Sequence, residues 1–80
     1  MPSIISISAE VSPNHSFAGK SVKEVEKAIG ARIVLVDRQD ENGDVEVLKP
    51  HTVEIIDVDD RIYLFLSKND LQKVERALEN

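Results

Sequence analysis

The 80-residue sequence contains no cysteine, which excludes disulfide bonds and thiolate metal ligands and agrees with a reducing cytoplasm. Aromatic residues make up only 4% of the chain, so rings for stacking single-stranded nucleic acid are not expected. No apolar run approaches the ~20 residues of a membrane span, and no secretory signal pattern is present. These absences predict a cytoplasmic protein without direct membrane insertion.

Positive charge is also in short supply, with 10 Lys and Arg against 15 Asp and Glu and a net charge of −5. The basic residues are scattered and form no stripe, which argues against nucleic acid as a partner. The length fits a single domain over residues 1–80, ordered from about residue 4 to 79. A core of this size rarely supplies more than ~3–5 kcal/mol, so oligomerisation is the remaining stabiliser.

The chain is organised around residues 31–38, in which four consecutive apolar residues include three that are β-branched. Such a run is typical of a buried strand. Because side chains alternate along a strand, Ile33 and Leu35 are predicted to point to one face. Val34 and Val36 are predicted to point to the other face. Both faces of this strand therefore need a cover.

The other elements follow from periodicity and end signals. Residues 4–11 alternate like an edge strand, and Ser21 with Glu24 forms a capping box that opens a helix ending at Gly30. The acidic turn at residues 40–44 contains Asn-Gly and predicts a hairpin. The predicted inward helix residues are Val22, Val25, Ala28 and Ile29 in the first helix, and Leu71, Val74 and Leu78 in the last.

The remaining segments complete a strand–helix–strand–strand–strand–helix order. A return strand at 45–48 is stopped by Pro50, and residues 62–66 form a second strand that is apolar on both faces. Asn69, with Gln72 as its box partner, is predicted to cap the final helix. We therefore expect a small α+β domain in which two helices cover one face of a four-stranded, mainly antiparallel sheet.

Two short helices leave the other sheet face without a cover. A second copy of the chain, giving a homodimer, is the simplest candidate, and an absent neighbouring domain is the alternative. Leu35 and Leu64 are both expected in the core.

Several local motifs resemble known sites but fail their requirements. Gly19-Lys20-Ser21 lacks the earlier glycine of a phosphate-binding loop, since position 14 is Asn. The acidic residues at 40–44 lack the glycine and glutamate of a calcium loop, and those at 57–60 fit a solvated turn better than a metal site. His15 and His51 have no evident catalytic partners, so the sequence offers no case for an enzyme.

Arg38 ends the central strand on the face of Val34 and Val36. It is interpreted either as an arginine whose stem covers apolar surface or as an anion-facing arginine near a dimer axis.

The pattern as a whole resembles the TrkA-C domain, the C-terminal module of RCK (regulator of K⁺ conductance) subunits. The resemblance rests on FAGKSVKEV at 17–25, IVLVDR at 33–38, Pro50, IDVDDRIYLF at 56–65 and DLQKV at 70–74. Asp60 matches an aspartate of the family pattern, whereas Asp59 stands where the family has glycine. Aspartate can adopt a left-handed turn, at some cost.

The resemblance implies a regulatory, ligand-sensing and dimerising module of a potassium or other cation channel or transporter, either free-standing or part of a longer protein. A ligand-free protein–protein interaction module is the alternative. Some members of the family bind cyclic di-AMP, a small anionic ligand, between two C-terminal domains. By position, this implies a ligand site made of Arg38, Leu48, Lys49, Pro50 and His51.

Overall fold

The computed structural model describes residues 3–79 and confirms the predicted order of helices and strands. The ends of the predicted domain, residues 1–2 and 80, lie outside the described residues. Two short 3₁₀ helices, η1 and η2, were not predicted. The elements are β1 (Ile4–Glu10), α1 (Val22–Ile29), β2 (Arg32–Gln39), β3 (Val45–Leu48), η1 (Pro50–Thr52), β4 (Arg61–Ser67), η2 (Lys68–Asp70) and α2 (Leu71–Leu78).

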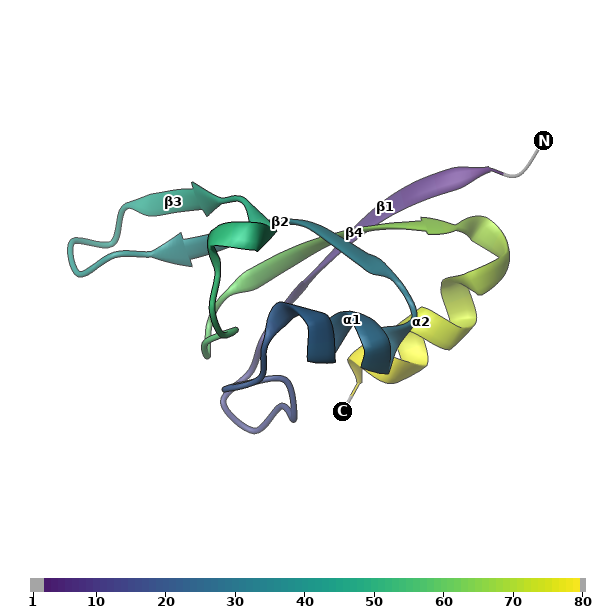
Figure 1. Cartoon of the computed structure of the whole chain (residues 1–80), viewed down its shortest axis with the longest axis horizontal. Helices are drawn as coiled ribbons and strands as arrows, with labels where there is room; N and C mark the ends of the chain where they lie inside the picture. Colours follow the sequence, from purple (N-terminus) through teal and green to yellow (C-terminus); the bar gives the residue numbers. More distant parts are fainter. Residues whose placement is uncertain (1–2, 80) are drawn as a thin grey trace.

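All strand pairs are antiparallel, and the sheet order is β1-β4-β2-β3, so β1 and β3 are the two edges. Both helices lie on the same side of this sheet (Figure 1). The β2–β3 hairpin extends beyond the helices, and the molecule is elongated, with extents of 43 × 24 × 19 Å. The predicted fold class, a small α+β domain with helices on one face, is confirmed.

The core lies between the helices and the inner face of the sheet. It takes alternate residues from β4, because a strand points every second side chain inward. It also takes residues from the loops at 11–17 and 53–56. The buried apolar residues are Val11, Phe17, Val22, Val25, Ile29, Ile33, Val36, Val53, Ile56, Ile62, Leu64, Leu66 and Val74.

A β-bulge in β2 overturns the predicted faces of the central strand. Ile33 pairs with Leu64 but Leu35 pairs with Tyr63, so Val34 is an extra residue between adjacent pairs. A bulge of this kind shifts the alternation by one position. Ile33 is consequently buried, whereas Leu35 is 39% exposed on the outer face. Placing Ile33 and Leu35 on one face, and Leu35 in the core, was wrong; the burial predicted for Leu64 is confirmed, since that residue is 0% exposed.

The helix ends were predicted in part. The capping box of Ser21 and Glu24 is present, and Gly30 ends α1 in the left-handed region at φ 71°. Ala28 is exposed rather than inward, because the buried side of α1 is narrow. The predicted start of the last helix at Asn69 was wrong: Lys68–Asp70 form η2, and α2 begins at Leu71 without a side-chain cap.

Candidate functional site

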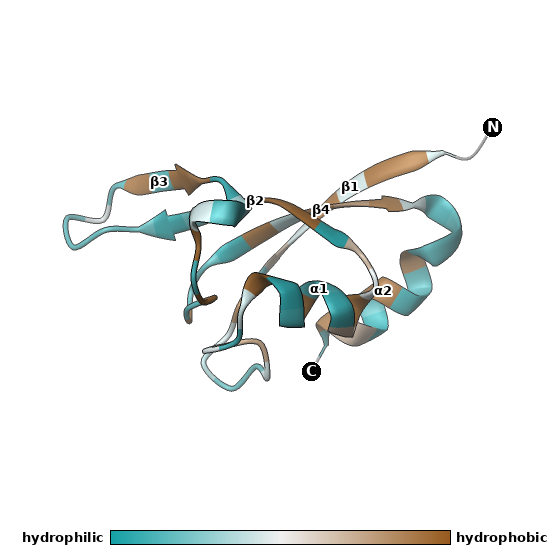
Figure 2. Ribbon diagram, viewed as in Figure 1, coloured by the Kyte–Doolittle hydropathy of each residue, from teal (hydrophilic) through white to brown (hydrophobic). Residues whose placement is uncertain are grey.

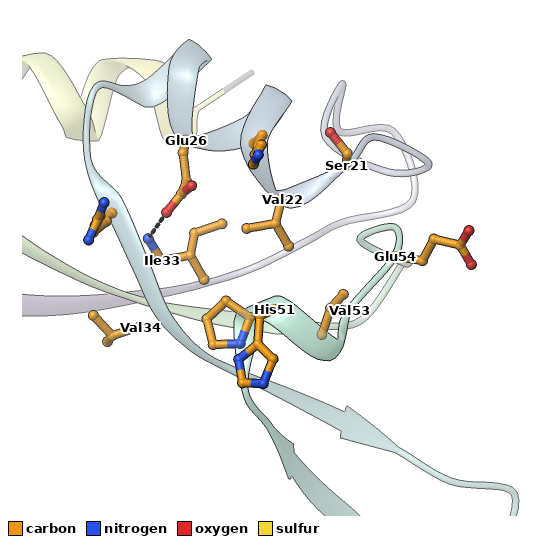
Figure 3. Close-up of a pocket in the computed structure, with 11 residues that line it drawn as sticks. Ser21, Val22, Glu26, Ile33, Val34, His51, Val53 and Glu54 are labelled. Atoms are coloured by element: carbon orange, nitrogen blue, oxygen red, sulfur yellow. Dashed lines mark hydrogen bonds between the residues drawn. The ribbon is translucent and has the colours of Figure 1, made fainter.

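A surface hollow of about 710 Å³ lies between the start of α1, the first half of β2 and η1. Its apolar side chains come from all of these segments, and its charged residues stand among them. The lining residues are Ser21, Val22, Lys23, Glu26, Arg32, Ile33, Val34, Pro50, His51, Val53 and Glu54. Figure 3 shows Val22 and Ile33 on one side of this hollow and His51 and Val53 on the other. We call it the α1–η1 pocket.

The pocket wall contains a hydrogen bond next to the β-bulge. The backbone N–H of Ile33 donates a 2.9 Å hydrogen bond to a carboxylate oxygen of Glu26, the contact dashed in Figure 3. A bulge disrupts the ladder locally, and buried backbone donors need a partner. Glu26 supplies that partner from the neighbouring helix. This contact therefore joins α1 to the start of β2 in the wall of the pocket.

The residues predicted as a ligand site are divided by the structure. Pro50 and His51 line the α1–η1 pocket, with His51 exposed. Lys49 precedes η1 and is exposed, while Leu48 is half-buried against the core. Arg38 lines a different hollow, near Glu10 and Tyr63. The structure thus brings Pro50 and His51 together and places the Arg38 guanidinium elsewhere.

The Arg38 guanidinium forms an ion pair with a carboxylate of the same chain, that of Asp60. Its Nε donates to Asp60 Oδ1 at 3.0 Å and its Nη2 donates to Asp60 Oδ2 at 2.8 Å, which is a two-pronged ion pair. Nη2 also donates to the carbonyl of Ile55 at 2.9 Å and lies 3.4 Å from a carboxylate oxygen of Asp57. The hydrogen bonds to Asp60 raise the pKa of Arg38. These contacts tie the end of β2 to the loop before β4.

Asp60 is buried, at 1% exposure, which corrects its interpretation as part of a solvated turn, whereas Asp57 and Asp59 are exposed as expected. Its carboxylate accepts from Arg38 and from the backbone N–H of Asp57 at 2.8 Å. Asp59 adopts the left-handed region at φ 70°, so aspartate makes the left-handed turn expected at this position. Within residues 3–79, the structure contains no group of three or more metal-ligating side chains.

His15 also has partners that the sequence did not reveal. Its Nδ1 accepts from the backbone N–H of Phe17 at 3.1 Å, and its Nε2 lies 2.8 Å from the carbonyl of Leu78. A ring nitrogen that accepts has no proton, so Nε2 carries the proton and donates it to Leu78. His15 therefore joins the loop after β1 to the end of α2, which is a structural role.

Sequence reasoning missed most of the pocket. Lys23 and Glu26, on the polar side of α1, were not predicted as site residues, and neither was Arg32. A signal existed for Lys23, because it lies in the first turn of a helix whose entry motif was recognised. No local signal marked Arg32 or Glu26, since their proximity to η1 depends on the packing of α1 against β2 and of β2 against η1.

Residues 7–79 of the chain match the TrkA-C domain family. No protein with a curated description matches the chain. Among residues 3–79, no helix combines the length and the apolar character that a membrane crossing needs.

Proposed function

Because the chain belongs to the TrkA-C domain family, whose members are regulatory domains associated with K⁺ transport, we propose that it senses a small anionic ligand for a cation channel or transporter. The proposed site is the α1–η1 pocket. The observation that carries this proposal is that Pro50 and His51, which the family pattern implies as ligand contacts, line a sizeable hollow. A cavity of this size is within the range of small-molecule sites.

The chemistry of the pocket suits a ligand with a flat apolar part and a phosphate. Val34 and Pro50 are partly exposed and give an apolar surface against which a purine ring can pack. Lys23 and Arg32 carry positive charge nearby, and arginine can hold a phosphate through two parallel donors. Cyclic di-AMP combines these features and is our candidate ligand. Contacts of the ligand with Arg38, Leu48 and Lys49 remain predictions.

The carboxylates of the pocket limit what it can bind. Glu26 already accepts from the Ile33 N–H, so part of its charge is compensated. Glu54 is exposed, where water screens it. The carboxylates of Glu26 and Glu54 both disfavour a ligand that concentrates several negative charges in one place. Two phosphates separated by ring systems fit this distribution better than a compact polyanion.

We further propose that the module works as a homodimer, which would give two copies of the pocket. A two-fold symmetric ligand such as cyclic di-AMP suits a symmetric dimer. The ligand-free interaction module is the competing interpretation, and calorimetric titration separates the two. In the proposed function, cyclic di-AMP binds with measurable heat; no heat with cyclic di-AMP contradicts the ligand proposal and favours the interaction module.

The matched variants are Lys23→Ala and Lys27→Ala, two exposed lysines one turn apart on α1. Only Lys23 lines the pocket, so Lys23→Ala should weaken binding about tenfold, the scale of one hydrogen bond to a charged group. Lys27→Ala should leave the affinity unchanged. Equal affinities for both variants, together with no effect of His51→Ala, would place the ligand elsewhere. Arg38→Ala is a poor probe here, because it also removes the partner of Asp60.

A further inference from the structure

The two edges of the sheet differ in how well they are protected against pairing with another chain. The edge strand β3 has only four residues, the polar turn at 40–44 precedes it and Pro50 follows it. The edge strand β1 has seven residues, and its first part is apolar in Figure 2. Residues 4–9 contain no charge and no proline, and their pairing with β4 runs without a bulge. Since charges, proline and bulges are what keep an edge from accepting another strand, β1 is the unprotected edge.

The hydrogen bonds at the two ends of β1 show which backbone groups face the free edge. The Ser3 carbonyl accepts from the N–H of Lys68 at 2.9 Å, and the N–H of Val11 donates to the Asp60 carbonyl at 2.8 Å. In an antiparallel pair, every second residue directs both of its backbone groups at the neighbouring strand. The odd-numbered residues of β1 therefore face β4, and the even-numbered ones turn their N–H and C=O groups outward. These residues, all of them exposed, are Ile4, Ser6, Ser8 and Glu10.

A hollow of about 430 Å³ lies beside this edge, between β1 and α2. Its apolar side chains are Ile7 and Ala9 of β1 and Leu78 of α2, which are half-buried against the core. Glu75 and Glu79, both exposed, stand on its α2 side. We call it the β1–α2 groove, and its lining residues are Ile7, Ser8, Ala9, Glu75, Leu78 and Glu79.

The charge of the groove indicates the chemistry of its occupant. Among the described residues that line it there are two glutamates and no lysine or arginine. Lys73 of α2 lies instead beside Gly30, at the end of α1. A second copy of the chain paired through β1 would bring the glutamates of both copies to the same edge, where they repel. A segment with positive charge is attracted there, so the groove favours a basic partner.

We propose that β1 accepts an extended, basic segment of another protein as a fifth strand of the sheet. An added strand lies about 4.8 Å beyond β1, and every second side chain of it points to the helix side, where the groove lies. The side chain beside Ile7 and Ala9 is expected to be apolar, and the inward side chains flanking it are expected to be lysine or arginine facing Glu75 and Glu79. In strand addition, main-chain hydrogen bonds give affinity and pockets for alternate side chains give specificity.

An NMR titration with a capped synthetic peptide, KTVTKT, tests this proposal. Its lysines and valine alternate with threonines, so one face of the extended peptide matches the groove. The acidic peptide ETVTET is the matched control, because it has the same length and apolar residue. The basic peptide should bind the chain at least about tenfold more tightly than the acidic one.

Hydrogen exchange of the backbone amides reports where the peptide pairs. In the free chain, the outward amide protons of Ser6 and Ser8 should exchange quickly, whereas those of Ile5 and Ile7, directed at β4, should exchange slowly. Near saturation, the basic peptide should slow exchange at Ser6 and Ser8 by about tenfold, because their amides then donate to the added strand. The amides of the opposite edge strand, β3, should be unaffected.

Two substitutions at one position separate the backbone from the side chain. Ser8→Pro removes an outward N–H, which an edge strand tolerates, and should weaken binding of the basic peptide about tenfold. Ser8→Ala is the control: it keeps the N–H and loses only the hydroxyl, which accepts from Arg61. It should bind like wild type, and circular dichroism checks that both variants are folded.

Two further variants separate the charge of the groove from the net charge of the chain. Glu79→Gln removes one negative charge from the groove and should weaken binding of the basic peptide severalfold. Glu41→Gln removes the same charge from the exposed hairpin turn and should leave the affinity unchanged. These two variants, together with the exchange measurement, decide the proposal even where Ser8→Pro does not fold.

Each contrary outcome overturns a defined part of the inference. Absence of binding by the basic peptide, or equal binding by the acidic one, overturns the basic partner. Binding that leaves exchange at Ser6 and Ser8 unchanged overturns strand addition at β1, and equal effects of Glu79→Gln and Glu41→Gln overturn the groove as the source of selectivity. Slow exchange at Ser6 and Ser8 in the free chain at high concentration would mean that a second copy occupies the edge. The cyclic di-AMP titration stands apart, because the groove and the α1–η1 pocket share no lining residue.

Discussion

The two halves of the sheet are held in different ways. The two helices cover the half formed by β1, β4 and the start of β2. This half is stabilised by buried apolar side chains such as Leu64 and Val74. The hairpin half, formed by the end of β2 and β3, extends beyond the helices. It is fixed to the loop before β4 by Arg38 and Asp60. The comparison teaches that an ion pair with one buried partner can anchor a part of the sheet that the helices do not cover.

The largest expected effect belongs to the helix-covered half. Leu64→Ala should lower the free energy of unfolding by ~4 kcal/mol, toward the upper part of the range for a fully buried leucine. Leu35→Ala, on the outer face, should cost less than ~1 kcal/mol when measured at a dilution that keeps the chain monomeric. Urea unfolding of both variants checks the contrast. Equal losses would mean that the β-bulge is absent and that Leu35 belongs to the core.

The next effect concerns the hairpin half. Arg38→Ala leaves the Asp60 carboxylate buried without its ion-pair partner and should cost ~3 kcal/mol, the low end for a broken buried pair, because the Arg38 side chain is itself 31% exposed. In the Arg38→Ala variant, the backbone amide protons of β3 should exchange with solvent faster than those of β1. Arg61→Ala is the matched control, since its ion pair with Glu10 is exposed on both sides and should contribute ~0–1 kcal/mol. Similar losses for the two arginines would refute the ion-pair account of the hairpin.

The smallest effect is the pH dependence of the cap of α1. Hydrogen bonding to the Ser21 backbone lowers the pKa of Glu24 below its ordinary value of 4.5, so the folded state favours the charged carboxylate. A lowered folded pKa contributes stability that is present above the unfolded value and is lost as the pH falls through the folded one. Glu24→Gln keeps the hydrogen bonds of the box but removes the titration.

The measurement is the difference in unfolding free energy between wild type and Glu24→Gln as a function of pH. The advantage of the wild type should be present at neutral pH and decline below about pH 4. An advantage that stays constant down to about pH 3 would mean that Glu24 does not titrate through the cap. The packing of the two halves of the sheet should be the same in wild type and in Glu24→Gln, because the cap lies at the surface.

Much of the fold could be predicted because its signals are local. The capping box needs only Ser21 and Glu24, three residues apart, and the left-handed end of α1 needs only Gly30. The hairpin turn likewise depends on neighbours: the Asp40 side chain accepts from the backbone N–H groups of Asn42 and Asp44. Each of these interactions is complete within one turn, so spacing along the chain was sufficient to identify it.

The site was less accessible to sequence reasoning. The resemblance to the family pointed to Pro50 and His51, which line the pocket, but it grouped them with Arg38, whose guanidinium lies on Asp60. Residues 38 and 60 are far apart in the sequence and neither has a local pattern that demands the other. The exposure predicted for the acidic turn was wrong for Asp60 for the same reason, because its partner Arg38 comes from β2, which is distant in the sequence.

The sequence by itself determined the order of the helices and strands, the two ends of α1 and the four-stranded sheet, since hydrophobic periodicity and end signals act within a few residues. Only the tertiary structure decided which apolar side chains of β2 are buried. The bulge at Val34 moves Leu35 to the outer face and leaves Ile33 in the core. The physical reason is that a strand alternates strictly only while its ladder is regular, and regularity depends on distant partners.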